Sequence, residues 1–179
     1  MVLKKLIKNI KKIMKINHPL SVDTWDKKEL SAITNVLNSK FITQGKNVKI
    51  FEKKFSNYLG TKYSVMVNSG SSANLLMIAA LFYTKDKKRK LKRGDEVIVP
   101  AIGWSTTYYP LQQYGLKLKF VDVDLQTLNF DIHQLTQAIN IKTKLIFAVN
   151  VCGNSNEFSE ILKLIKSKNI LLIEDNCES

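Results

Sequence analysis

A nearly unbroken apolar run, Lys144-Leu-Ile-Phe-Ala-Val149, decides the fold class of this sequence. Similar short runs occur at Glu96–Val99, Leu118–Val121 and Ile170–Ile173, and Tyr63–Val67 predicts one more strand. Segments with helical spacing lie between the runs. Short apolar strands that alternate with helices are typical of βαβ units, in which helices cover both faces of a parallel sheet. The sequence therefore predicts an α/β fold with three layers, α/β/α, and a mostly parallel sheet.

Six stretches outside the strands place apolar residues at helical spacing. The first follows a capping residue, which we predict to be Asp23 or Thr24. The second begins at Gly45 and ends at Gly60, which fits the left-handed conformation that often closes a helix. The predicted helices are Trp25–Asn38, the stretch from Gly45 to Gly60, Ala73–Phe82, Thr106–Tyr114, Asp131–Ile139 and Glu157–Ser167.

The composition excludes several classes of protein. The 179 residues are 45% hydrophobic and 24% charged, which is typical of a globular domain and not of a disordered or fibrous chain. No apolar run approaches the roughly 20 residues that span a bilayer, and lysines interrupt the N-terminus where a signal peptide would be apolar. Cys152 and Cys177 are too few for a disulfide scaffold and lack metal-binding spacing. We therefore expect a cytoplasmic protein without stable membrane insertion.

The net charge of +13 is concentrated in two places. Residues 3–16, within an arm that we place at residues 1–22, combine lysines with an apolar stripe and predict a basic amphipathic helix. In one interpretation this helix packs on its own chain or on a twin subunit, and in another it makes peripheral contact with anionic lipids. The second cluster, Lys85–Arg93, is interpreted as a solvated loop. Neither cluster is interleaved with aromatic residues, so nucleic acid is not an expected partner.

Polar segments follow the predicted strands, at the edge where open parallel sheets bind ligands. Asn68-Ser-Gly-Ser-Ser-Ala-Asn74 is a turn that enters a helix, where free backbone amides suit a phosphate and Gly70 permits a close approach. It lacks the residues of a P-loop and of a dinucleotide fingerprint. A serine-rich helix cap without a ligand is the alternative. The other segments that follow strands are Ala101–Thr107, Asn150–Asn156 and Asp175–Ser179.

Two single residues add to this pattern. Asp175 ends a strand, and its carboxylate suits a metal, a sugar hydroxyl or a protonated ring nitrogen. Trp104 follows another strand, where its ring can stack on a planar ligand or pack in the core. His18 and His133 have no metal-binding spacing and are expected at the surface, so no metal is predicted. A phosphate cradle, a flat aromatic surface and an acid together describe a pyridoxal phosphate pocket.

Four segments carry a family resemblance: Asn68-Ser-Gly-Ser-Ser-Ala-Asn-Leu75, Gly94-Asp-Glu-Val-Ile-Val-Pro-Ala101, Phe120-Val-Asp-Val-Asp124 and Ile173-Glu-Asp-Asn-Cys-Glu178. Through them the sequence resembles the DegT/DnrJ/EryC1/StrS family of nucleotide-sugar aminotransferases from about Leu20 to Ser179. The resemblance implies the aspartate aminotransferase fold (fold type I), pyridoxal 5'-phosphate or pyridoxamine 5'-phosphate as cofactor, a nucleotide-sugar substrate and a homodimer. Residues 23–179 would be the N-terminal part of the cofactor-binding large domain, incomplete at its C-terminus and without the small C-terminal domain.

The resemblance also implies roles for individual residues. The serine-rich turn would hold the cofactor phosphate, the tryptophan would stack on the pyridine ring, the aspartate would pair with the ring nitrogen, and a glutamate would lie near the phenolic oxygen. The implied cofactor-binding residues are Gly70, Ser71, Ser72, Trp104, Asp175 and Glu178. The implied substrate-binding residues, which border the sugar pocket, are Thr43, Gln44 and Gly45.

The lysine that forms the Schiff base in this family lies beyond the strand that ends at Asp175, and no lysine here matches it. We therefore assign no catalytic residue and expect a truncated gene product, a split gene or a partial sequence. A subgroup carries histidine in place of that lysine and removes the C3 hydroxyl of a nucleotide-linked 4-keto-6-deoxyhexose instead of transaminating. Asn68–Leu75, Glu174–Glu178 and the basic N-terminal helix resemble this dehydratase subgroup more closely.

Three interpretations of function therefore stay open. The first is an enzyme of surface polysaccharide (O-antigen-type) biosynthesis, in which we favour dehydration and keep transamination as an alternative. The second is a catalytically inactive remnant. The third is a basic module that binds membranes or nucleic acid.

Overall fold

The computed structural model describes residues 22–179, which divide into two compact units. The first unit ends at Met66, and the second comprises Val67–Ser179. The predicted basic helix at residues 3–16 lies outside the described residues, and the predicted domain boundary after residue 22 stays a prediction.

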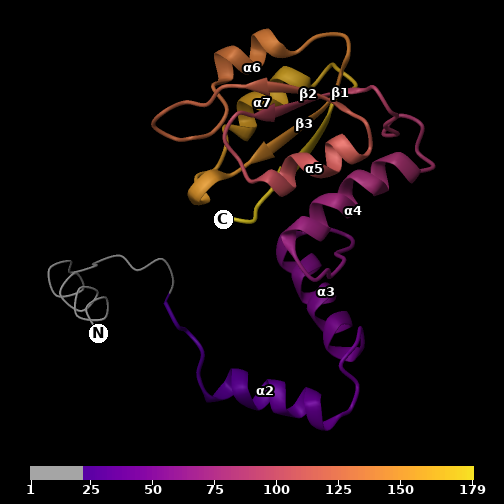
Figure 1. Cartoon of the computed structure of the whole chain (residues 1–179), viewed down its shortest axis with the longest axis vertical. Helices are drawn as coiled ribbons and strands as arrows, with labels where there is room; N and C mark the ends of the chain where they lie inside the picture. The colour runs from indigo at the N-terminus through magenta and orange to yellow at the C-terminus, as the bar shows by residue number, and fades with distance from the viewer. Residues whose placement is uncertain (1–21) are drawn as a thin grey trace, which may run out of the picture. The chain divides into compact units, whose positions relative to one another are not determined.

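The first unit holds two helices, α2 (Lys27–Asn38) and α3 (Lys46–Leu59) (Figure 1). Both were predicted from their apolar spacing. Gly60 follows α3 with φ at +67°, a left-handed conformation that glycine adopts at little cost because it has no Cβ. The prediction that Gly60 ends this helix is therefore confirmed.

The start of α2 differs from the prediction. Its N-cap is Asp26, so the assignments to Asp23 and Thr24 were wrong. The Asp26 carboxylate accepts a hydrogen bond from the Lys28 N–H, and the Glu29 carboxylate accepts one from the Asp26 N–H at 2.8 Å. Unlike Asp23 and Thr24, Asp26 has a glutamate three residues later, which is the spacing that a capping box requires.

The predicted strand at Tyr63–Val67 is not formed. A strand needs a neighbour for its backbone hydrogen bonds, and among residues 22–179 no segment pairs with this one. Its polar groups contact α3 instead. The Met66 N–H donates to the Glu52 carboxylate at 2.9 Å, and the Ser64 hydroxyl donates to the Glu52 carbonyl oxygen.

The second unit contains a parallel sheet of four strands in the order β2-β1-β3-β4. Each strand lies within two residues of its predicted bounds. The two central strands are the most buried, because neighbours pair with both of their edges and helices cover both of their faces. The strands are β1 (Glu96–Pro100), β2 (Lys117–Val121), β3 (Thr143–Val149) and β4 (Leu171–Asp175).

Helices cover both faces of this sheet, which confirms the three-layer α/β/α fold (Figure 1). Two helices, α4 (Gly70–Tyr83) and α5 (Ser105–Gln113), pack on one face. The other face is covered by α6 (Ile132–Ala138) and α7 (Phe158–Ile165). A short 3₁₀ helix, η1 (Val151–Gly153), follows β3.

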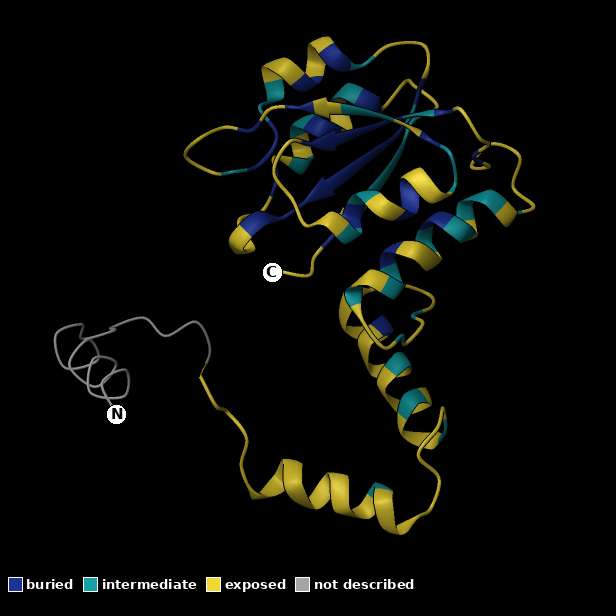
Figure 2. Cartoon of the chain, viewed as in Figure 1, coloured by how far each residue is buried: buried dark blue, intermediate teal, exposed yellow. Residues whose placement is uncertain are grey.

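The core of the second unit lies in two layers, one on each face of the sheet (Figure 2). Successive side chains of a strand point to opposite faces. Ile98 and Ile146 therefore pack toward α6 and α7, while Val97, Val99 and Phe147 pack toward α4 and α5. This packing holds the sheet rigidly, so that the segments leaving the ends of the strands start from fixed positions.

Two further observations concern the surface of the described chain. Within residues 22–179, no helix combines the length and the apolar character needed to cross a membrane. His133 is exposed on α6, as expected, whereas His18 lies outside the described residues.

Candidate functional site

Three of the four predicted segments follow strands and meet at one edge of the sheet, whereas Asn68–Ser72 follows no strand and reaches this edge through α4. Because the strands are parallel, their carboxyl ends share that edge. The Asn150 N–H donates to the Asp175 carbonyl oxygen at 3.2 Å, and the Asn150 side chain donates to the Asn176 side chain at 2.5 Å. These bonds join the segment after β3 to the segment after β4.

Asp175 ends β4, the outer strand beside β3, at this edge. Its side chain is buried, with 6% of the residue exposed. Oδ2 accepts hydrogen bonds from Nδ2 of Asn74 and from Oγ1 of Thr107, each at 2.8 Å, and Oδ1 accepts one from the Cys177 N–H at 3.1 Å. Asn74 belongs to α4 and Thr107 to α5. One carboxylate therefore connects two helices to the end of β4.

All three donors to Asp175 are electrically neutral. Within residues 22–179, no basic side chain forms a salt bridge with this carboxylate. A carboxylate has about four positions that accept hydrogen bonds, and three of them are in use. The remaining position has no hydrogen-bond partner within the described residues, and a cationic donor would be its strongest partner.

The charge of Asp175 also affects Tyr108. Burial raises the pKa of the Tyr108 hydroxyl above its ordinary value, and the negative charge of Asp175 raises this pKa further. The hydroxyl donates a hydrogen bond to the Pro100 carbonyl oxygen at 2.9 Å. Tyr108 therefore stays protonated near neutral pH and holds α5 against the end of β1.

The serine-rich turn forms the first turn of α4, because the helix begins at Gly70 and not at Ala73 as predicted. Ser69 is the N-cap, and its hydroxyl oxygen accepts a hydrogen bond from the Ser72 N–H at 3.2 Å. The first N–H groups of a helix have no partner within the helix. With Ser72 bound to the cap, the N–H groups of Gly70 and Ser71 are the ones available to an anion.

Gly70 also allows α4 to pack closely on the segment after β4. A Cβ atom at this position would lie 2.9 Å from Sγ of Cys177, which is too close for real atoms. On the side of α5, a hollow of about 210 Å³ borders the first turn of α4. Its lining residues are Ser71, Ser72, Leu75, Thr106, Tyr109, Pro110 and Gln113.

Trp104 is exposed to solvent, whereas the carboxylate of Glu178 is hydrogen-bonded to the backbone. Trp104 directly precedes α5 and is 71% exposed, which excludes the alternative that it packs in the core. Its stacking on a planar ligand stays a prediction. The Glu178 carboxylate accepts a hydrogen bond from the Cys152 N–H at 2.7 Å, so it already contacts the backbone of η1.

The predicted sugar-pocket residues belong to the first unit. Thr43, Gln44 and Gly45 lie between α2 and α3. Thr43 and Gly45 border a hollow of about 660 Å³ that residues of both helices line, together with Phe41. Their role toward a sugar stays a prediction.

Sequence reasoning missed Asn74 and Thr107 as site residues. Asn74 is the only polar residue in the apolar stretch Ala73–Phe82. Because buried polar side chains need hydrogen-bond partners, that pattern was a usable signal. Thr107 carried no such signal, since Thr106 stands beside it with the same side chain.

Comparison with known proteins identifies relatives over nearly the whole chain. The model of the DegT/DnrJ/EryC1/StrS aminotransferase family matches residues 23–179. GDP-4-keto-6-deoxy-D-mannose 3-dehydratase of Yersinia pseudotuberculosis is 60% identical over 170 residues, which are 95% of this chain and 42% of the relative. The chain thus spans less than half of that protein's length.

A solved structure and a more distant relative complete the comparison. The structure of Escherichia coli GDP-4-keto-6-deoxy-D-mannose-3-dehydratase with bound hydrated PLP superposes with a TM-score of 0.87 at 58% identity, and the match covers 91% of this chain and 41% of that one. GDP-perosamine synthase of Escherichia coli O157:H7 is 31% identical over 153 residues, which are 85% of this chain and 40% of the relative.

Thr107→Val tests the contact with Asp175. The substitution keeps the shape of the side chain but removes one donor to a buried carboxylate, so we expect the free energy of unfolding to fall by about 1–3 kcal/mol. Thr106→Val is the matched control, because its hydroxyl makes no hydrogen bond within the described residues, and we expect it to change stability by less than about 0.5 kcal/mol. Urea denaturation measures both. Equal losses in the two variants would contradict a special role for Thr107.

Proposed function

Because the chain belongs to the DegT/DnrJ/EryC1/StrS aminotransferase family, we propose that it forms the cofactor-binding part of an enzyme that uses pyridoxal or pyridoxamine 5'-phosphate on a nucleotide-linked 4-keto-6-deoxy sugar. The observation that carries the proposal is the buried Asp175 carboxylate, which has only neutral donors and one free position. The proposed pathway is surface polysaccharide biosynthesis of the O-antigen type. A cytoplasmic location is proposed as well, and the free thiols of Cys152 and Cys177 fit a reducing compartment.

The residues at this edge fit the cofactor. The available N–H groups of Gly70 and Ser71 would bind its phosphate at the start of α4, where the helix dipole also favours an anion. The Ser71 hydroxyl borders the hollow beside this turn and would add a further donor, and Ser72 would contribute its hydroxyl. When bound, the cofactor would supply a ring that withdraws electrons from the substrate carbon.

Asp175 would accept a hydrogen bond from the protonated ring nitrogen at its free position. Asn74 and Thr107 hold Oδ2 of this carboxylate in place, so its orientation is set before a ligand arrives. Because both donors are neutral, the full negative charge of Asp175 would act on the ring nitrogen and keep it protonated. Asn74 and Thr107 are therefore proposed as positioning residues.

The remaining sequence-derived residues have proposed roles at the border of the site. Trp104 is exposed after β1, which leaves its ring free to stack on the pyridine ring. Glu178 would lie near the phenolic oxygen and would have to share its carboxylate with the Cys152 N–H. Thr43, Gln44 and Gly45 are proposed to border the sugar.

Dehydration is the reaction we favour. The chain is 60% identical to a 3-dehydratase and 31% identical to GDP-perosamine synthase over comparable stretches. The proposed cofactor-binding residues would serve either reaction and do not distinguish them. The higher sequence identity to the 3-dehydratase therefore supports removal of the C3 hydroxyl over transamination. A catalytically inactive remnant is the alternative.

We also propose that two copies of the chain form a homodimer. Leu30, Ile33 and Leu37 recur at helical spacing along α2 and are exposed, and α2 buries none of its residues. An apolar stripe of this kind on a helix normally packs on another protein surface. A second copy is the occupant we propose.

Spectroscopic titration of the purified chain with pyridoxal 5'-phosphate tests cofactor binding. We expect saturable uptake, and we expect Asp175→Asn to weaken it by at least about tenfold, because a charge-assisted hydrogen bond is lost. Glu174→Gln is the matched control, since this neighbouring carboxylate is exposed and points to the opposite face of β4. Absence of uptake by the unmodified chain, or equal weakening by both variants, would contradict the proposed site.

The product separates the proposed reactions. A full-length protein that contains this chain, incubated with pyridoxamine 5'-phosphate and a nucleotide-linked 4-keto-6-deoxyhexose, is expected to give a sugar that has lost its C3 hydroxyl, as measured by mass spectrometry and NMR. A product that keeps this hydroxyl and gains an amino group would show an aminotransferase. Uptake of the cofactor without turnover would favour the inactive remnant.

Sedimentation analysis tests the dimer. We expect a mass of twice 20.4 kDa for the unmodified chain. Leu30→Glu together with Leu37→Glu should shift the equilibrium toward the monomer, because a charge in a buried apolar contact is costly. Lys27→Glu with Lys28→Glu introduces the same side chains outside the apolar stripe and should leave the dimer intact. A monomeric unmodified chain would refute the proposal.

A further inference from the structure

The basic segment Lys85–Arg93 is not a free loop. The Leu91 N–H donates to the Leu81 carbonyl oxygen at 3.0 Å, which ties the segment to the end of α4. Asp86 and Asp95 organise its two ends, because their carboxylates accept hydrogen bonds from the N–H groups of Lys88 at 3.0 Å and Lys92 at 2.9 Å. These hydrogen bonds therefore order the backbone from which the basic side chains of this segment extend.

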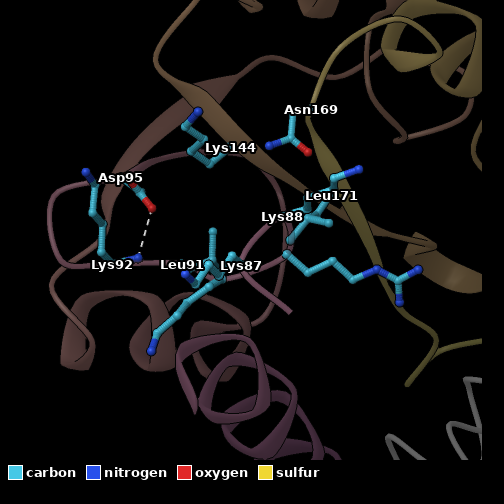
Figure 3. A pocket seen from close by; sticks show the side chains of 10 residues that line it. Lys87, Lys88, Leu91, Lys92, Asp95, Lys144, Asn169 and Leu171 are labelled. Atoms are coloured by element: carbon cyan, nitrogen blue, oxygen red, sulfur yellow. Dashed lines mark hydrogen bonds between the residues drawn. The ribbon is translucent and has the colours of Figure 1, made fainter. Parts of the chain in front are cut away.

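This segment lines a hollow of about 450 Å³ at the amino end of the sheet, opposite to the end that holds Asp175. Figure 3 shows Lys144 and Asn169 across the hollow from the segment that carries Lys87, Lys88 and Lys92. Lys144 belongs to β3, and Asn169 precedes β4. The volume lies within the range of about 300–1,000 Å³ that is typical of small-molecule sites.

Positive charge dominates the lining of the hollow. Six of its residues are cations and one is an acid, Asp95, whose carboxylate already accepts the Lys92 N–H. The lining cations are Lys87, Lys88, Arg89, Lys90, Lys92 and Lys144. Within residues 22–179, only Arg89 among them forms a salt bridge, an exposed one with Asp86 at 3.5 Å.

Lys144 adds a separate observation. It is only half-exposed, and no acidic side chain of the described residues forms a salt bridge with it. A lysine without a counter-charge is available to an anion that enters the hollow. Lys144 thus borders the same hollow as the cations of the loop, and it also borders a neighbouring hollow together with Lys168.

We propose that this hollow binds a small molecule that carries two or more linked phosphate groups. Each terminal phosphate group carries about 1.5–2 negative charges near neutral pH, so a short phosphate chain matches the cluster of cations. The hollow would recognise the phosphate chain itself. Both an inorganic polyphosphate and a nucleoside triphosphate contain such a chain. This site is independent of the proposed cofactor site and stands even if that proposal fails.

The lining favours this ligand over larger anions. No aromatic residue lines the hollow, so it offers no surface on which nucleic-acid bases can stack. Its apolar residues, Leu91 and Leu171, are buried and half-buried, and so they do not project toward a lipid surface. A compact anion can enter the hollow and contact cations on both sides.

Calorimetric titration of the complete chain with inorganic tripolyphosphate tests the proposal. We expect saturable binding that weakens as salt is added. Lys88→Ser with Lys144→Ser should lower the affinity by at least about tenfold, because charge-assisted contacts from both sides of the hollow are lost. Lys163→Ser with Lys166→Ser removes the same charge from α7 and the residue that caps its C-terminus, on the other face of the sheet, and should change the affinity by less than about twofold.

Two further measurements locate the site and identify its ligand. Amide NMR shifts should be largest at Lys87–Lys92, Lys144 and Asn169, and Ser71→Ala should leave the affinity unchanged, because the turn at Ser69–Ser72 is a different site. A nucleoside triphosphate that binds at least as well as tripolyphosphate, with the same variant pattern, supports a nucleotide as the source of the phosphate chain. If the variant at Lys144 does not fold, Lys88→Ser with Arg89→Ser, both exposed, takes its place.

Several results would overturn the proposal. Binding that is not saturable, equal losses in the two pairs of variants, or NMR shifts centred on Ser69–Ser72 would each show that no site exists in this hollow. Duplex DNA or anionic vesicles that bind more tightly than tripolyphosphate, with the same loss in the Lys88 and Lys144 variant, would assign this surface to nucleic acid or to a membrane instead.

Discussion

Asn74 from α4 and Thr107 from α5 both donate hydrogen bonds to one oxygen of the buried Asp175 carboxylate, and this contact joins the helical layer to the end of β4. A buried carboxylate is costly unless its oxygens are hydrogen-bonded. The positions of the two helices relative to the sheet are therefore constrained by the need to satisfy one acid. The first turns of both helices consequently lie at the edge where the strand-end segments meet.

The neutrality of these donors matters for the chemistry. An arginine or lysine partner would have neutralised Asp175 and left little charge for a ligand. Amide and hydroxyl donors hold the carboxylate in one orientation but leave its charge uncompensated. The Asp175 carboxylate is thus held in one orientation while its negative charge has no cationic partner. This arrangement is expected of a site that is organised before its ligand binds.

The two ends of the sheet differ in character. Small polar side chains and a single buried acid gather at the carboxyl end, around Asp175. At the amino end, a segment tied to α4 and a lysine of β3 surround a hollow with positive charge. Part of the net charge of +13 is therefore organised by the fold and is not spread evenly over the surface.

Much of the fold could be predicted from local sequence, because four buried strands require nearly continuous apolar runs and amphipathic helices require periodic ones. The sequence by itself also determined that Asp175 ends a strand and that a serine-rich turn opens a helix. The segment Tyr63–Val67 does not form the expected strand, because a strand needs a neighbouring strand for its hydrogen bonds and local sequence does not reveal that neighbour. Only the tertiary structure decided which donors reach Asp175, since Asn74 and Thr107 lie 101 and 68 residues away along the chain. Hydrogen bonds act over about 3 Å, and the distance between such remote residues is set by the packing of whole helices on the sheet.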